Sequence, residues 1–172
     1  GGIQGTVDQQ MGGQGAGDPV GWGSSIRAHP LADESPKAVI VQFAKGDMTV
    51  PNQTASALIR AGGLEDRATY FRNDLAFATI AGYTVKNPHT FLTNLAGVPG
   101  QLAVAAQLQI ATFLATGGAV TIDPDGAGPY FETPIAGPQN VLQQVIESQR
   151  GNERVSGADL RDVRDIAEAF RR

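Results

Sequence analysis

The sequence contains no cysteine in its 172 residues. This absence excludes disulfides, thiolate nucleophiles and cysteine-ligated metals such as a zinc finger. It does not fix the cellular compartment, because a chain of this length buries roughly 70% of the surface that it exposes when unfolded and needs no crosslinks. Hydrophobic residues make up 41% of the chain, so the composition favours one folded domain over disorder.

Excess positive charge and long apolar runs are also missing. The chain has 13 Lys and Arg against 17 Asp and Glu, so nucleic acid is not an expected partner. Residues 87–122 carry one ionisable side chain, that of His89, but prolines, glutamines and a glycine pair interrupt them, and no transmembrane segment is predicted. Residues 1–17 lack the basic start and apolar run of a signal peptide, so any export signal lies elsewhere.

Composition divides the chain into three parts. Residues 1–35 are rich in glycine and are predicted to be irregular, as a lid or linker. Residues 36–116 alternate apolar runs with amphipathic segments and predict an α/β core. Residues 117–172 predict a β-hairpin followed by amphipathic helices.

The core begins with a strand, a loop and a helix. The apolar run from Lys37 to Ala44 is rich in β-branched residues and predicts a buried, parallel strand. A helix is expected from Asn52 to Ala61, with Asn52 near its cap and a glycine pair closing it. A second strand is predicted from Ala68 to Arg72, and a loop carrying His89 follows.

The rest of the chain predicts helices and one hairpin. Apolar residues surround the axis of a helix expected from Gln101 to Ala115, so we expect it to be buried on more than one side. The segment from Ala119 to Glu132 predicts two short strands joined by a turn at residues 124–126. Amphipathic helices are predicted near Val141 to Glu147 and near Asp159 to Phe170.

Asp47 and His89 are the candidate catalytic residues. Asp47 follows the first strand, and a carboxylate at the carboxyl end of a strand can accept the Nδ1 proton of a histidine and hold its tautomer. Such a pair is a general base with its orienting acid, and it requires a nucleophile. Two structural alternatives stay open: Asp47 caps the helix that begins near Asn52, or the ring of His89 bonds to backbone.

Other polar residues favour structural roles. His29 belongs to no motif, and two histidines alone make a weak metal site. The segment Asp123 to Gly128 resembles a calcium loop but lacks an oxygen ligand at Ala127, so a turn is favoured. Asp74 is interpreted as a salt-bridge partner, with a role behind the candidate site as the alternative. No metal or cofactor site is predicted.

The spacing of the candidate residues resembles the C-terminal part of the α/β-hydrolase family, over about Pro36 to Thr116. In that family the acid follows the seventh strand and the histidine lies after the eighth. The large bacterial lipase and esterase type is the most similar, through these segments: Gly17-Asp-Pro-Val20, Gly46-Asp47-x-x-Val50-Pro51, Arg60-Ala-Gly, Tyr70-Phe-Arg-Asn-Asp74-Leu-Ala-Phe and Asn87-Pro-His89. The resemblance implies that Asp47 is the triad acid and His89 the general base. It implies no cofactor.

The family's nucleophile is missing from this sequence. No serine has glycine two residues away on both sides, as the G-x-S-x-G elbow requires. The family order of serine, acid and histidine puts the serine and the oxyanion hole upstream, on a missing segment or a second chain of a heterodimer. The implied function is the acid and base half of a serine hydrolase that acts on carboxylic esters, and the isolated chain is expected to be inactive.

A second hypothesis needs no triad. In it the chain is a non-catalytic α/β interaction domain that packs on a partner, because two or three strands alone leave much of a sheet exposed. Localisation follows from no residue in the chain. The resemblance alone favours a secreted or cell-envelope bacterial protein.

Overall fold

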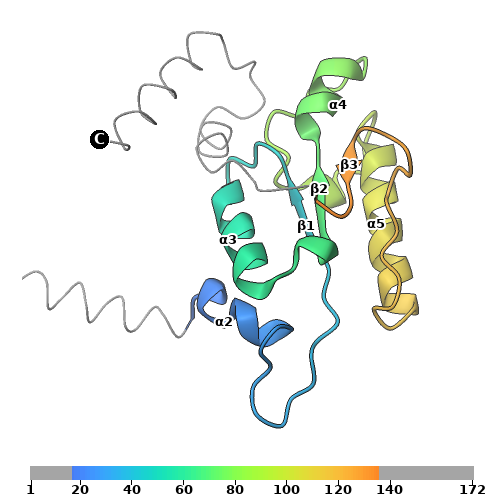
Figure 1. The fold of residues 1–172 in the computed structure, drawn as a ribbon. Helices are drawn as coiled ribbons and strands as arrows, with labels where there is room; N and C mark the ends of the chain where they lie inside the picture. The colour runs from blue at the N-terminus through green and yellow to red at the C-terminus, as the bar shows by residue number, and fades with distance from the viewer. Residues whose placement is uncertain (1–16, 136–172) are drawn as a thin grey trace, which may run out of the picture.

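The computed structural model describes residues 17–135, which form helices around a small sheet (Figure 1). This part of the chain contains four α-helices and three strands, so the general α/β class is confirmed. In chain order, with η for a short 3₁₀ helix, the elements are α2 (Pro19–Ile26), β1 (Val41–Ala44), α3 (Asn52–Gly62), η1 (Glu65–Arg67), β2 (Ala68–Phe71), α4 (Asn73–Thr79), η2 (Phe91–Thr93), α5 (Gly100–Ala115) and β3 (Phe131–Glu132).

The sheet has the strand order β1-β2-β3. β1 and β2 are parallel, with Val41 beside Ala68 and Ala44 beside Phe71. β3 is antiparallel to β2 and places Phe131 beside Phe71. The predicted parallel strand is therefore confirmed as β1, although only the second half of the apolar run belongs to the strand. The second predicted strand is confirmed as β2.

The two faces of the sheet carry separate apolar clusters, because successive side chains of a strand point to opposite faces. On one face, Phe43 stacks on Tyr70 with ring centroids 4.5 Å apart, in a cluster with Ile59 of α3. On the other face, Phe71 stacks on Phe91 with centroids 5.0 Å apart, in a cluster with Ala106 of α5. Figure 1 shows α3 and α5 on opposite sides of the strands.

The helix expected after the first strand is confirmed as α3, and its end follows from glycine. Gly63 has a left-handed φ of 58°, and the N–H of Leu64 bonds to the carbonyl of Ile59 at 2.9 Å, as in a Schellman C-cap. At the other end, Asn52 lies next to the cap as expected, but its side chain does not cap the helix. Pro51 precedes the first turn, and the side chain of Asn52 bonds to the loop before the helix instead.

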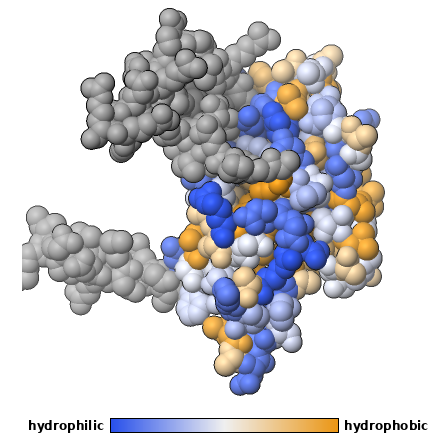
Figure 2. All heavy atoms as spheres, in the orientation of Figure 1, coloured by the Kyte–Doolittle hydropathy of each residue, from blue (hydrophilic) through white to orange (hydrophobic). Residues whose placement is uncertain are grey.

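The helix expected from Gln101 is confirmed as α5, but the expectation of burial on more than one side is wrong. Ala103 and Ala106 of α5 are buried, with Ala106 in the cluster that contains Phe71 of β2, whereas Val104, Leu108 and Leu114 are 56%, 57% and 70% exposed. A sheet of three short strands covers only one face of a 16-residue helix. Apolar spheres accordingly lie over α5 at the right of Figure 2. Within residues 17–135, no helix is both long and apolar enough to cross a membrane.

The expected hairpin from Ala119 to Glu132 is wrong. The segment contains one strand, β3, which pairs with β2 rather than with its own neighbour. The turn itself is confirmed at residues 124–127, where Asp125 Oδ2 accepts a hydrogen bond from a backbone N–H of the same segment at 2.8 Å. The first half of the segment bonds to α5 instead, because Gln109 Nε2 donates to the carbonyl of Ile122.

A helix interrupts the stretch of residues 1–35 that was expected to be irregular, so that expectation is wrong for α2. Asp18 caps α2, since its Oδ1 accepts a hydrogen bond from a backbone N–H of the first turn at 2.9 Å. Gly23 lets α2 approach α3 closely. A Cβ at Gly23 would lie only 2.9 Å from the Cβ of Ala61.

Several expectations lie outside the described residues. They concern the two C-terminal helices, near residues 141–147 and 159–170, and the glycine-rich residues before 17. The division of the chain at residues 35 and 116 stays a prediction.

Candidate functional site

The loop that carries Asp47 is anchored where it leaves β1. The chain turns at Gly46, whose φ of 80° a glycine adopts without strain. The side chain of Asn52, which is 1% exposed, bonds on both sides of this turn. Its Oδ1 accepts from Gly46 N at 3.0 Å, and its Nδ2 donates to the carbonyl of Ala44 at 2.5 Å. A buried amide at the start of α3 therefore sets the position of Asp47.

The two carboxylate oxygens of Asp47 have different partners. Oδ1 accepts hydrogen bonds from the backbone N–H groups of Thr49 at 2.8 Å and Val50 at 2.9 Å. These contacts fold the loop before α3. Asp47 does not cap that helix, because the N-cap of α3 is Pro51 and no side chain bonds there. The Asp47 side chain is only 13% exposed, and its Oδ2 faces His89.

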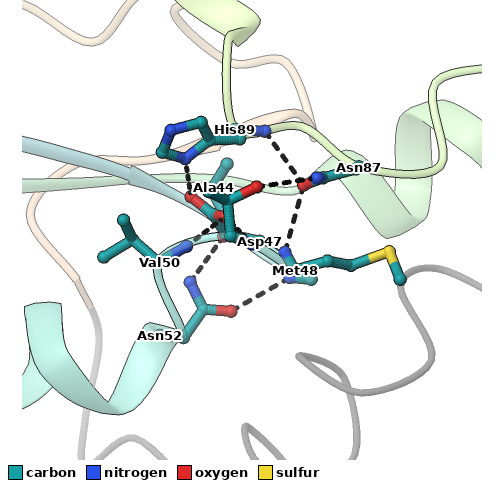
Figure 3. Close-up of polar contacts among 9 residues, drawn as sticks. Ala44, Asp47, Met48, Val50, Asn52, Asn87 and His89 are labelled. Carbon is teal, nitrogen blue, oxygen red and sulfur yellow. Dashed lines mark hydrogen bonds and ion pairs between the residues drawn. The ribbon is translucent and has the colours of Figure 1, made fainter.

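His89 meets Asp47 from the loop between α4 and η2, as expected for its position. Its Nδ1 lies 3.0 Å from Asp47 Oδ2, so the ring bonds to the carboxylate rather than to backbone. The ring is 38% exposed, and Figure 3 shows its other nitrogen pointing away from Asp47. A carboxylate beside Nδ1 holds the imidazole proton there, which leaves a lone pair on Nε2. That nitrogen can accept a proton from a group in front of it.

Asn87 lies between the two loops. Its Oδ1 accepts from Met48 N at 3.0 Å and from His89 N at 3.3 Å, and its Nδ2 donates to Thr49 Oγ1 at 3.0 Å. The dashed lines of Figure 3 show this side chain beside both loops. The two loops are thus joined twice, by the contact between the Asp47 and His89 side chains and by the hydrogen bonds of the Asn87 amide.

A cluster of ion pairs lies where β2 ends. Asp74 accepts hydrogen bonds from Arg72 Nε at 2.9 Å and Nη2 at 2.8 Å, and it lies 3.2 Å from Lys45 Nζ. Arg72 also pairs with Glu132 of β3 at 2.5 Å. Burial raises the pKa of Asp74, but the Arg72 hydrogen bonds and the two positive charges outweigh it and lower that pKa below its ordinary value. Asp74 is therefore a salt-bridge partner, as interpreted, although it is half-buried.

The remaining candidates have structural contacts. The backbone N–H of His29 donates to the carbonyl of Ser24 at 2.7 Å. Burial, together with a hydrogen bond and the charge of Asp125, raises the pKa of Asp123. Within residues 17–135, no set of three or more His, Cys, Asp or Glu side chains is arranged to hold a metal ion.

The hydrogen bonds of Asn52 and Asn87 were not among the features predicted from the sequence. A signal existed for Asn87, because asparagine two residues before a bonded N–H is the spacing of an Asx turn. No local signal connects Asn52 with Gly46, since the bond joins a helix start to the end of the preceding strand.

Comparison of the chain with protein-family models, with curated proteins and with solved structures gave no match.

Proposed function

We propose that this chain supplies the acid and the general base of a serine hydrolase that acts on carboxylic esters. The observation that carries the proposal is the 3.0 Å contact between Asp47 Oδ2 and His89 Nδ1. The contact lies beyond the carboxyl end of β1, the edge at which open α/β sheets place their sites. The acid is the more buried partner and the ring the more exposed one, which leaves Nε2 accessible to a reacting group.

The proposed reaction has two halves, acylation of the serine and its deacylation, and His89 first accepts and then donates a proton in each. Its Nε2 takes the proton of the serine hydroxyl as the serine oxygen attacks the ester carbonyl, and then gives that proton to the departing alcohol. Water next attacks the acyl-serine and passes a proton to Nε2, which returns it to the serine as the acid leaves. Asp47 stays ionised throughout and stabilises the imidazolium. No cofactor takes part in these steps.

The nucleophile of the proposed enzyme comes from outside this sequence. The chain has no cysteine, and none of its serines lies in a G-x-S-x-G elbow. The serine and the oxyanion hole would belong to an upstream segment or to a second chain. The isolated chain would then be inactive.

A specific observation favours a second candidate, a non-catalytic domain that packs on a partner. In the described part of the chain, β1 pairs with β2 alone, and α5 exposes Val104, Leu108 and Leu114. An open strand edge and an apolar helix face are both surfaces that partners cover. A hydrolase with a separate serine segment would use the same surfaces, so only activity separates the two candidates.

The test uses the native protein together with any chain that accompanies it. A fluorophosphonate probe reports an activated serine, and hydrolysis of a p-nitrophenyl ester reports turnover. Asp47→Asn and His89→Ala should each reduce labelling and turnover by about 10⁴-fold. His29→Ala is the matched control and should leave both unchanged. Full activity in both variants would sink the hydrolase proposal in favour of the interaction domain.

A further inference from the structure

The amide of Asn87 connects the Asp47 loop with the His89 loop. Two of its three hydrogen bonds reach the acid loop, at Met48 N and Thr49 Oγ1, and the third reaches His89 N. Met48 and Thr49 lie 39 and 38 positions from Asn87 in the sequence, whereas His89 lies two positions from it. One side chain therefore connects both members of the candidate pair.

Asn87 and Asp47 together bind a run of backbone N–H groups. Asn87 Oδ1 takes the N–H of Met48, and Asp47 Oδ1 takes those of Thr49 and Val50. Three successive amides of the acid loop are thus used by two side chains. Removing the Asn87 side-chain amide takes this acceptor away from the backbone N–H of Met48 and from that of His89 at the same time.

Packing alone does not hold the imidazole in this position. The His89 side chain is 38% exposed, and Met48 and Val50 of the Asp47 loop are themselves 43% and 46% exposed. More than a third of the ring is therefore open to solvent, and polar contacts must supply much of its orientation. Asp47 bonds the ring, and Asn87 bonds the backbone that carries it.

Only an amide side chain can make all three hydrogen bonds while staying uncharged. The carbonyl oxygen accepts from two backbone N–H groups, while the NH₂ donates to the Thr49 hydroxyl. Aspartate at this position would lose the donor and add a negative charge near Asp47. Alanine would lose every contact. The chemistry of the site therefore explains an asparagine at this position.

We infer that Asn87 is a positioning residue that holds the Asp47 and His89 loops in register and so keeps the imidazole proton on Nδ1. This inference rests on the proposed function, in which Nε2 must be the free nitrogen. Asn87 touches neither the ring nor a reacting atom in this role.

Nuclear magnetic resonance of the ¹⁵N-labelled 172-residue chain tests the inference without any activity. The chain has two histidines, so His29 supplies an internal reference for the ring nitrogens of His89. The wild-type ring of His89 should carry its proton on Nδ1. In Asn87→Ala that preference should disappear, and the Nδ1 proton should exchange with water about tenfold faster. Thr90→Ala, which removes an exposed side chain next to His89, should behave as wild type.

The outcomes separate this inference from the proposed function. An unchanged tautomer and unchanged exchange in folded Asn87→Ala would overturn the positioning role while leaving the hydrolase proposal untouched. If Asn87→Ala does not fold, Thr49→Val replaces it, because it removes the exposed partner of Nδ2 and keeps the Thr49 backbone bond. Faster exchange in Thr49→Val supports the role, and unchanged exchange overturns it.

A kinetic experiment adds a second readout once the serine segment is present. Loss of ring position should lower kcat by about 10²-fold while KM stays within about twofold. A rise in KM alone would contradict a positioning role. If the hydrolase proposal fails but Asn87→Ala still changes the tautomer, the geometric inference stands and its use in catalysis does not.

Discussion

Asp47 Oδ2 lies 3.0 Å from His89 Nδ1, although 42 positions separate the two residues. The Asp47 side chain is 13% exposed and that of His89 is 38% exposed. The carboxylate is thus shielded behind the ring, and the imidazole faces outward. This order allows Asp47 to orient the ring while a separate group reacts at Nε2.

Asp47→Asn should separate folding from catalysis. The asparagine side chain can still accept the Thr49 and Val50 N–H bonds through one oxygen, so the loop should keep its shape. The melting temperature should change little, while ester hydrolysis by the assembled protein falls by about 10⁴-fold. Asp33→Asn is the control, since asparagine tolerates the positive φ of 66° at that exposed position. A large drop in melting temperature would instead assign Asp47 a structural role.

Asn52→Ala should destabilise the fold. The change removes the partners of Gly46 N and the Ala44 carbonyl at a fully buried position. We expect the free energy of unfolding to fall by about 2 kcal/mol, because unsatisfied buried polar groups keep their desolvation cost. Urea denaturation measures it. Thr54→Ala, on the exposed face of α3, should stay within about 0.5 kcal/mol of wild type, and an equal effect of both changes would contradict the prediction.

Tyr83 should make stability sensitive to alkaline pH. Burial raises its pKa from 10.0 to about 12, and its hydroxyl donates to Asn73 Oδ1 at 2.5 Å. Since the folded pKa is raised, the contribution to stability is complete below pH 10 and is lost as the pH rises through about 12. Tyr83→Phe should lower the free energy of unfolding by about 1 kcal/mol at pH 8, and the difference from wild type should shrink above pH 10. Parallel stability curves for the two proteins would contradict this.

Asp74 should make stability sensitive to acid. Its pKa is lowered, despite burial, by the Arg72 hydrogen bonds and by the charges of Lys45 and Arg72. A lowered folded pKa stabilises the protein above the ordinary value of 3.8, and that contribution is lost as the pH falls through the folded pKa. Asp74→Asn should therefore destabilise the protein at pH 7. It should also make the free energy of unfolding fall less steeply as the pH is lowered toward 3. Chemical denaturation at several pH values measures both effects. A decline as steep as that of wild type would contradict the assignment.

The order of the core elements could be predicted from the sequence. The β-branched run before Ala44, the glycine pair at Gly62 and the aromatic segment at Tyr70 are local signals, and β1, α3 and β2 follow them. The loop positions of Asp47 and His89 were also predictable. Their contact is present, whereas their catalytic role stays a prediction.

Two wrong predictions, the hairpin after Ala119 and the burial of α5, have a common physical reason. The turn residues at 124–126, between two short β-favouring stretches, predicted a local hairpin, but β3 paired with β2 because that strand offered a free edge in the sheet. Apolar residues around α5 predicted burial, but only one helix face found a sheet to cover. Local pattern specifies what a segment can form, and the available neighbours decide which surface it covers.

The sequence by itself determined the α/β class, the strand, loop and helix order, and the loops in which Asp47 and His89 lie, because these follow from local periodicity and turn residues. Only the tertiary structure decided the partners of Asn52 and Asn87 and the pairing of β3. Those contacts join groups from different elements, and a hydrogen bond depends on where the folded chain places its donor and acceptor rather than on their separation in sequence.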